Sequence, residues 1–402
     1  MESKFVTFSK IISVSIRRCV LTACCLSWWL LPLKAQTDSS QLRISLLTCG
    51  PGEDLYSIWG HTAIRVIDTA RQADVVFNYG TFDDSDPLFY IKFTRGIMIY
   101  SVAPYAFTDF MTEYQQGGRS VTEQVLQLSA AEKIQLTAAL WKNTSKEYRD
   151  YPYHFYADNC TTRARDILMN NMDSGVQYKN IRPQPATSTY RQLIHSYMNS
   201  SSQAWNRFAI DVLLGNHLDE TMTNRQAMFL PDYLMKGFDG ALIRGQPLVM
   251  QTNQLLPDAR QHTGSLFTPI LLFSLLLAAF LVTTFVKNNA AQKTALVMDS
   301  VFFLLTGLLG VLMLILWIAR VDTVCRNNYN LLWALPTHTI IAFVVNRKNT
   351  WIKNYWLITA ALNALLLLAW KWLPQEMNSS LLLVTVILLF RNLVRWQNIQ
   401  KS

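Results

Sequence analysis

Hydrophobic and polar positions follow a strand pattern early in the chain and give way to long apolar segments after Leu266. Residues 43–49 (RISLLTC) form an apolar run that ends at a Gly-Pro-Gly turn. Residues 61–68 (HTAIRVID) alternate and are rich in branched side chains, and 75–80 (VVFNYG) follow after a polar segment. Because successive side chains of a strand point to opposite faces, these runs predict three strands, the last two paired in a hairpin.

The mixed pattern continues to about residue 170. It predicts a strand at 89–103, a short helix at 107–118, a strand at 120–128 and a helix at 129–148. The last of these opens with Ser129 and carries Glu132 three positions later, which is a capping-box pattern. Strands followed by helices indicate an α+β arrangement.

Residues 170–262 have a different character. Amphipathic helices are predicted at 186–199 and 202–215, and a third at 228–243 is broken by Pro231. We interpret this stretch as a helical cap that belongs to the same domain as the preceding strands.

Five apolar segments then predict an all-α, five-helix transmembrane domain over residues 263–402: 266–286, 298–319, 330–346, 354–373 and 380–395. Two of them are short for a hydrocarbon core of about 30 Å, so tilt or neighbouring helices must help them. Lys and Arg gather in the first and third loops and at the C-terminus. The positive-inside rule places these in the cytoplasm, and residues 37–262 then lie on the outer side of the membrane.

Residues 1–36 predict a signal sequence that agrees with this topology. Basic residues precede an apolar run from Cys19 to Leu33, and Ala35 is a small residue at a cleavage position. An uncleaved anchor is the alternative. The net charge of +9 does not indicate nucleic-acid binding, because Lys and Arg flank apolar runs rather than forming a basic stripe.

Cys160 is the strongest candidate for chemistry. It follows an aromatic run and the N-cap residue types Asp158 and Asn159, and helical spacing follows it. In the first turn of a helix, free backbone N–H groups and the helix dipole lower the pKa of a thiol and stabilise an oxyanion. The alternatives are a structural cysteine or a disulfide with Cys49, which export permits.

His61 is the candidate base, because it opens a strand beside Gly60 and a Cys–His pair is the usual way to form a thiolate. Asn78, on the strand expected beside it, is the candidate group that orients the imidazole, with Asp83 and Asp84 as competitors. His154, His195, His217 and His262 are weaker candidates. Their spacing shows no metal-ligand pattern, and the sequence has no Gly-rich phosphate loop or dinucleotide fingerprint, so neither a metal nor a cofactor is expected.

Two polar residues fall within predicted membrane segments, Asp299 and His338. A helix–helix hydrogen bond is the favoured interpretation of His338, and a lipid or headgroup path is the alternative.

The order GHTAIRV, FNYG, DNCTTR resembles the circularly permuted NlpC/P60 papain-like fold, in which the histidine strand precedes the cysteine helix. Lecithin:retinol acyltransferase-like enzymes share this order. LLTCGPGEDLYSIWGHTAIRV, VFNYGTFD, FYIKFTRGIMIYSV, YHFYADNCTTRARDIL and MFLPDYL resemble more closely the lipoprotein N-acyltransferase family of Bacteroidota, Lnb. The resemblance implies Cys160 as nucleophile, His61 as base and a five-helix membrane domain.

The sequence and this resemblance together predict a membrane-embedded thiol acyltransferase of the bacterial inner membrane. An acyl chain would pass from a membrane phospholipid through a Cys160 thioester to the N-terminal amine of a diacylated lipoprotein. Two alternatives remain: a peptidoglycan amidase or endopeptidase with the same dyad, and a non-catalytic membrane assembly factor.

Overall fold

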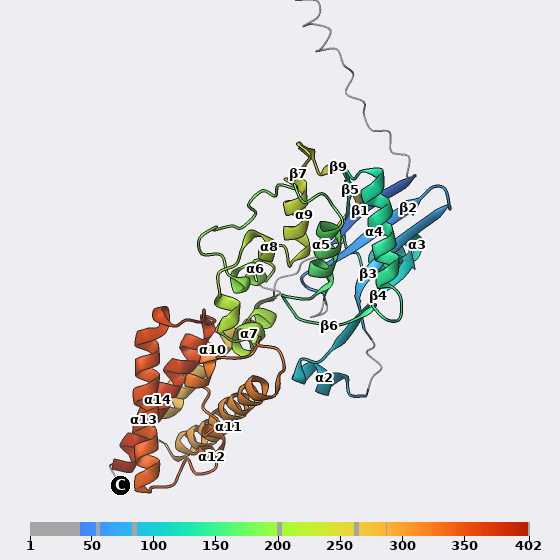
Figure 1. Cartoon of the computed structure of the whole chain (residues 1–402). Coiled ribbons are helices and arrows are strands. Elements are labelled where there is room, and N and C mark those ends of the chain that lie inside the picture. Colours follow the sequence, from blue (N-terminus) through green and yellow to red (C-terminus); the bar gives the residue numbers. More distant parts are fainter. Residues whose placement is uncertain are drawn as a thin grey trace, which may run out of the picture. The chain divides into compact units, whose positions relative to one another are not determined.

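The computed structural model describes residues 41–53, 57–82, 87–198, 203–260, 265–286 and 288–400 (Figure 1). The signal sequence predicted at residues 1–36 lies outside these residues, as do Asp83, Asp84 and His262.

A seven-stranded sheet forms the centre of the N-terminal part, with strand order β6-β4-β3-β2-β1-β5-β9. Every neighbouring pair in it is antiparallel. The strands are β1 (Leu42–Cys49), β2 (His61–Asp68), β3 (Ala73–Thr81), β4 (Ile99–Ala106), β5 (Val121–Leu126), β6 (Asp150–Pro152) and β9 (Val249–Leu256). The three strands predicted first, and the hairpin of β2 and β3, are confirmed.

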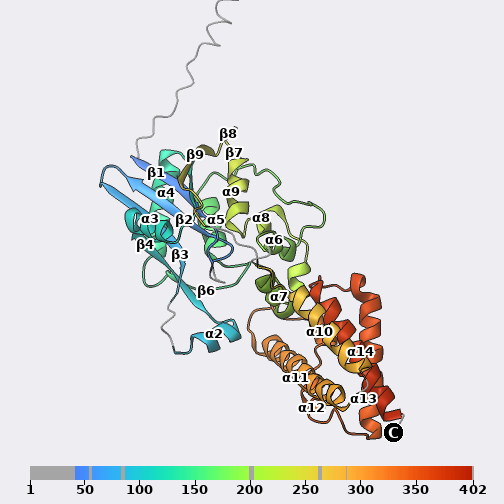
Figure 2. The same cartoon turned by 180° about the vertical axis from the view of Figure 1, so that it is seen from behind.

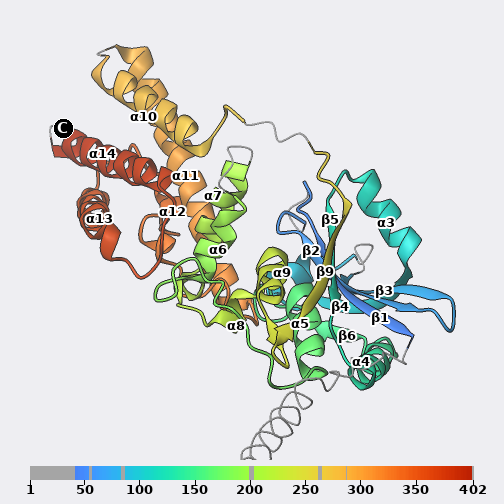
Figure 3. The ribbon, with the colours of Figure 1, turned by 90° about the horizontal axis from the view of Figure 1, so that it is seen from above.

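Helices cover both faces of this sheet, which explains why its central strands are so apolar. On one face, Ile44, Ile64 and Phe77 pack in a core with residues of α4 (Ala130–Asn143), α5 (Cys160–Asn170) and α9 (Pro231–Asp239). On the other face, Leu47 and Val76 pack against Phe110 and Tyr114 of α3 (Phe107–Gln116). Figure 3 shows α3 and α9 on opposite sides of the strands. The predicted helices at 107–118 and 129–148 are confirmed, with the capping box of Ser129 and Glu132.

The strand predicted at 89–103 is wrong in its first half. Residues Phe89–Arg95 form a helix, α2, and only Ile99–Ala106 form a strand. Apolar residues at alternate positions in FYIKFTR suggested a strand, but Gly96 takes the left-handed conformation (φ 65°) that ends a helix. The helix-ending Gly96 was therefore a better guide to the structure of this segment than the alternation of its apolar residues.

The stretch 170–262, interpreted as a helical cap, also contains strands that were not predicted. The helices are α6 (Tyr190–Ser196), α7 (Ala204–Leu213), α8 (Asn224–Ala227), α9 and a short 3₁₀ turn, η2 (Asn216–Asp219). Pro231 begins α9 instead of breaking a helix, because the first helical position needs no N–H donor. The segment also contains a small ribbon of β7 (Leu242–Ile243) and β8 (Gln246–Pro247), and β9 at the edge of the main sheet. As an edge strand, β9 (VMQTNQLL) lacks the apolar alternation that reveals a strand.

The C-terminal part is helical: α10 (Pro269–Phe285), α11 (Asn289–Ala319), α13 (Thr350–Ala369) and α14 (Ser380–Gln400). Three helical stretches of the described residues, 289–319, 350–372 and 380–400, are long and apolar enough to cross a membrane, and α10 is a shorter apolar helix. The helix α14 packs against both α10 and α13 (Figures 1 and 2).

The helix predicted at 330–346 is not continuous, so the count of five membrane helices is not confirmed. The segment contains a 3₁₀ turn, η3 (Tyr329–Leu332), and a four-residue helix, α12 (His338–Ile341), with Pro336 between them. It lies tightly against α11, since a Cβ added at Gly310 would come within 2.0 Å of the Ala334 carbonyl oxygen.

The polar residues within the membrane helices bind one another. The Asp299 carboxylate on α11 accepts hydrogen bonds from Arg391 Nε (2.6 Å) and Nη2 (2.8 Å) on α14, and it also pairs with Arg395. His338 Nδ1 lies 3.4 Å from Thr306 Oγ1 on α11. Both contacts join separate segments, and the second agrees with the helix–helix interpretation of His338.

Candidate active site

The start of α5 is held rigidly, and this fixes the position of Cys160. Asn159 is the N-cap: its side-chain oxygen accepts from the Thr162 N–H (2.9 Å), and Thr162 Oγ1 accepts from the Asn159 N–H (2.8 Å). The Asn159 amide also donates to the carbonyls of Phe155 (2.9 Å) and Phe229 (3.1 Å). The helix begins at Cys160 as predicted, so the thiol lies in the first turn.

The helix docks on the strand that carries His61. Thr62 Oγ1 and Thr161 Oγ1, both buried, lie 3.0 Å apart and join β2 to α5. The Thr62 backbone N–H and the His61 side chain both lie close enough to the Cys160 sulfur to lower its pKa. The structure therefore brings the predicted nucleophile and base into contact across 99 residues of sequence.

Asn78 completes the arrangement from the neighbouring strand. Ala63 on β2 pairs with Asn78 on β3, which places the amide beside His61. His61 Nε2 and Asn78 Oδ1 are 2.5 Å apart. Since Asn78 occupies Nε2, the other ring nitrogen, Nδ1, is left for the sulfur. The three residues predicted from sequence thus form one chain of contacts from Cys160 through His61 to Asn78.

The electrostatics of this chain favour a thiolate. Burial raises the pKa of Cys160, but the charge of His61 and the hydrogen bonds from His61, Thr62 and Thr161 outweigh it and lower the pKa from 9.0 to about 7. Burial lowers the pKa of His61, but the charge and hydrogen bond of Cys160 and the bond with Asn78 raise it above its usual 6.5. A thiolate–imidazolium pair is therefore well populated near neutral pH.

Gly80 closes one side of the pair. Its φ of 94° lies in the region that favours glycine. A Cβ there would come within 3.4 Å of Cys160 Cβ, 3.9 Å of His61 Cε1 and 4.0 Å of Tyr100 Cδ2. The backbone of β3 thus passes directly beside the side chains of Cys160 and His61.

A stack of three aromatic rings lies next to Gly80. Tyr100 stacks on Phe82 (ring centroids 5.0 Å apart) and on Tyr153 (4.3 Å). Burial and the nearby Cys160 raise the pKa of Tyr100 to about 12, so its hydroxyl stays neutral. Sequence analysis did not assign these residues to the site, although the aromatic run that contains Tyr153 was visible.

The other candidate cysteine and the other candidate histidines have different surroundings. Cys49 and Cys160 are both free thiols, and burial raises the pKa of Cys49 to about 12. His195 binds Asp211 (2.7 Å) and His217 binds Glu220 (2.7 Å). His154 Nδ1 accepts from the Ala157 N–H (3.3 Å). With a pKa of about 12, the Cys49 thiol is protonated near neutral pH and cannot act as the nucleophile there.

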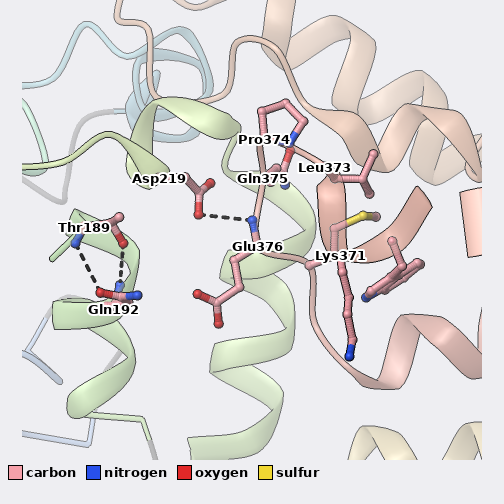
Figure 4. Close-up of a pocket in the computed structure, with 10 residues that line it drawn as sticks. Thr189, Gln192, Asp219, Lys371, Leu373, Pro374, Gln375 and Glu376 are labelled. Atoms are coloured by element: carbon pink, nitrogen blue, oxygen red, sulfur yellow. Dashed lines mark hydrogen bonds between the residues drawn. The ribbon is translucent and has the colours of Figure 1, made fainter. Parts of the chain in front are cut away.

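A separate pocket of about 420 Å³ lies between the start of α6 and the segment that links α13 to α14 (Figure 4). Asp219 accepts from the Glu376 N–H (3.1 Å) at its edge. Behind it, Asp211 binds Arg191 (3.1 Å) and Asn378 (2.9 Å). The pocket includes none of the three predicted site residues, and this buried network ties the cap to the helical part.

These features define a membrane protein with a mixed α/β domain on a helical transmembrane domain. Residues 31–196 match the model of the Lnb N-terminal periplasmic domain, and residues 261–402 match that of the Lnb transmembrane domain. The chain belongs to the Lnb family, as the sequence resemblance implied, and its N-terminal part is periplasmic. The search of curated proteins and the search of solved structures each found no match to this chain.

Proposed function

We propose that this protein is a lipoprotein N-acyltransferase in which Cys160 is the nucleophile, His61 the general base and Asn78 the residue that positions His61. The observation that carries the proposal is the contact of a helix-start thiol with a partly buried imidazole, in a chain of the Lnb family. The same contact supports the further proposal that the domain is a circularly permuted NlpC/P60 papain-like fold, in which a cysteine helix meets a histidine strand.

The first half of the cycle forms a thioester. The Cys160 thiolate attacks the carbonyl carbon of a phospholipid acyl ester, and its electron pair forms the new C–S bond. Backbone N–H groups at the start of α5 stabilise the oxyanion. The tetrahedral intermediate collapses by breaking the C–O bond, and the His61 imidazolium gives its proton to the departing alkoxide. The products are acyl-Cys160 and a lysophospholipid.

The second half transfers the chain to nitrogen. The uncharged α-amine of the N-terminal cysteine of a diacylated lipoprotein attacks the thioester carbonyl, and neutral His61 accepts the amine proton. Collapse breaks the C–S bond and returns the thiolate–imidazolium pair. The reaction consumes one ester and one amine and forms one amide and one alcohol, so it balances without an oxidant, a reductant or a further co-substrate.

The membrane domain supports transfer over hydrolysis. Both proposed substrates are held in a bilayer, and a transmembrane domain brings them to one thiol, which removes much of the entropic barrier of a two-substrate reaction. A peptidoglycan hydrolase acts on a water-exposed polymer and has no use for such a domain. The periplasmic N-terminal part carries Cys160, which supports a reaction with acceptors held at the periplasmic face of the membrane.

The direct test is to incubate the purified full-length protein with radiolabelled phospholipid. A hydroxylamine-sensitive label on Cys160, released as N-acylated product when diacylated lipopeptide is added, is the expected result. A protein that cleaves cell wall but never acquires the label is a hydrolase instead. A protein that does neither, while Cys160 remains accessible to alkylation, is a non-catalytic factor.

A further inference from the structure

The helix α2 carries apolar side chains on its outside, although it belongs to the periplasmic domain. Ile91 is 57% exposed and Phe93 53%, and Ile99 at the start of β4 is 55% exposed. Isolated exposed apolar residues are common, but here three of them lie within nine positions of one small element, with Ile91 and Phe93 on different sides of the helix. The helix has no acidic residue in its first turn and has Lys92 and Arg95 in its last turn.

This element is fixed to the end of a membrane helix. The Val321 N–H donates to the Arg95 carbonyl (3.0 Å), and Arg320 Nη1 donates to the Phe93 carbonyl (2.9 Å). Arg320 and Val321 directly follow Ala319, the last residue of α11. Figure 2 shows α2 close to the end of α11.

The end of α11 is itself apolar and exposed. Ile318 is 74% exposed and Val321 is 64% exposed, so the apolar surface of the membrane helix continues into α2. The apolar part of α11, residues 298–319, spans about 33 Å at ~1.5 Å per residue, which matches the hydrocarbon thickness of about 30 Å. The backbone hydrogen bond from the Val321 N–H to the Arg95 carbonyl therefore ties α2 to the end of this apolar stretch.

The same element leads directly to Cys160. It forms part of the connection from β3 to β4, whose two ends supply Phe82 and Tyr100. These rings stack with each other, and Tyr100 is within 4.0 Å of a Cβ placed at Gly80, the residue beside the sulfur. One short segment thus joins an apolar surface at membrane level to an aromatic wall at the thiol.

We propose that α2 and the start of β4 insert into the outer leaflet of the membrane and pass a phospholipid acyl ester along Phe82 and Tyr100 to Cys160. The partner is a lipid surface with phosphate headgroups, which suits Lys92 and Arg95 beside apolar Ile91 and Ile99. The route to the thiol rests on the proposed acyltransferase function, whereas the lipid contact of α2 does not.

Photo-crosslinking tests the contact without relying on activity. The full-length protein is placed in vesicles of phosphatidylethanolamine and phosphatidylglycerol with p-benzoylphenylalanine at position 91. The matched control carries it at position 134, because Ile134 on α4 is also 57% exposed. Phospholipid adducts are expected at position 91 and not at 134. Absence of adducts at position 91, or equal yields at both, overturns the proposal.

Ile91→Glu and Ile134→Glu test the route. Acylation of Cys160 from vesicle phospholipid should fall at least about fivefold in I91E and stay unchanged in I134E. Alkylation of Cys160 by iodoacetamide should be equal in both, which shows that the site is intact. Wild-type acylation by I91E overturns the route. If the wild type is never acylated while position 91 crosslinks to lipid, the proposed function fails and the lipid contact stands.

Discussion

At the residue scale, the reactivity of Cys160 depends on a small set of contacts. A pKa of about 7 gives a thiolate fraction of about one half at pH 7, whereas a pKa of 9.0 would give about one hundredth. Most of that difference comes from His61, which supplies both a charge and a hydrogen bond. The other donors, Thr62 and Thr161, keep part of the effect when the imidazole is removed.

We predict that Cys160→Ser abolishes acyl transfer and that His61→Ala reduces it at least about a hundredfold, because thiolate and base are lost. Alkylation of Cys160 by iodoacetamide, measured against pH, should rise through a midpoint near 7 in the wild type. In His61→Ala the midpoint should move up towards 9.0, since the lowering charge is gone. An unchanged midpoint would mean that His61 does not act on the thiol.

Asn78 should act through His61 and not on the substrate. Asn78→Ala should lower turnover by about tenfold or more, because the imidazole loses the 2.5 Å contact that orients it. Asn78→Asp should restore much of the rate, with the pKa of His61 raised further by the new carboxylate. The acidic limb of the pH–rate profile should then move to higher pH, since His61 must be neutral to accept the amine proton. Full activity of Asn78→Ala with an unshifted profile would contradict this role.

At the element scale, the cap of α5 links stability to chemistry. Asn159→Ala should lower the free energy of unfolding by about 1–2 kcal/mol and also reduce Cys160 acylation, because the same cap sets the position of the first turn. Ser129→Ala is the matched control, since Ser129 caps α4 in an equivalent capping box away from the site. It should lower stability by a similar amount and leave acylation unchanged. Equal acylation by the two variants would show that the Asn159 cap affects stability but not the reactivity of Cys160.

The elements show how far sequence can predict such a site. Strand β2, strand β3 and the start of α5 were predictable because apolar periodicity and capping residues are local signals. His61 and Cys160 followed from their places at those element boundaries, and Asn78 from its place on the strand expected beside His61. Helix α2 was missed because its apolar residues alternate like those of a strand, and β9 was missed because this edge strand lacks such alternation. The rings of Phe82 and Tyr100 come together only through the pairing of β3 with β4, which no local pattern reveals.

At the scale of the whole molecule, the cap and the helical part share buried groups. Val212 of α7 is 2% exposed and packs in the core of the membrane helices. Asn328 donates to the Val212 carbonyl (2.7 Å), and Asn330 donates to the Asp211 carbonyl (2.8 Å). Removing the membrane domain would expose Val212 and leave Asp211 without Asn378. The sheet, α4 and α5 have a core of their own and do not depend on these contacts.

We therefore predict that residues 37–262 alone retain the sheet and an alkylatable Cys160 with a midpoint near pH 7, but are less stable around α7 and fail to acylate lipoproteins. Hydrogen exchange should be faster in α7 than in β1–β3, because α7 loses its buried partners. Acyl transfer should be lost because substrates are no longer held within reach of the thiol. The measurement compares full-length and truncated proteins on a diacylated lipopeptide in detergent and on isolated cell wall. If the truncated form acylates the lipopeptide at an undiminished rate, the membrane helices serve only as an anchor. If the truncated form cleaves cell wall, the protein is a hydrolase and not an acyltransferase.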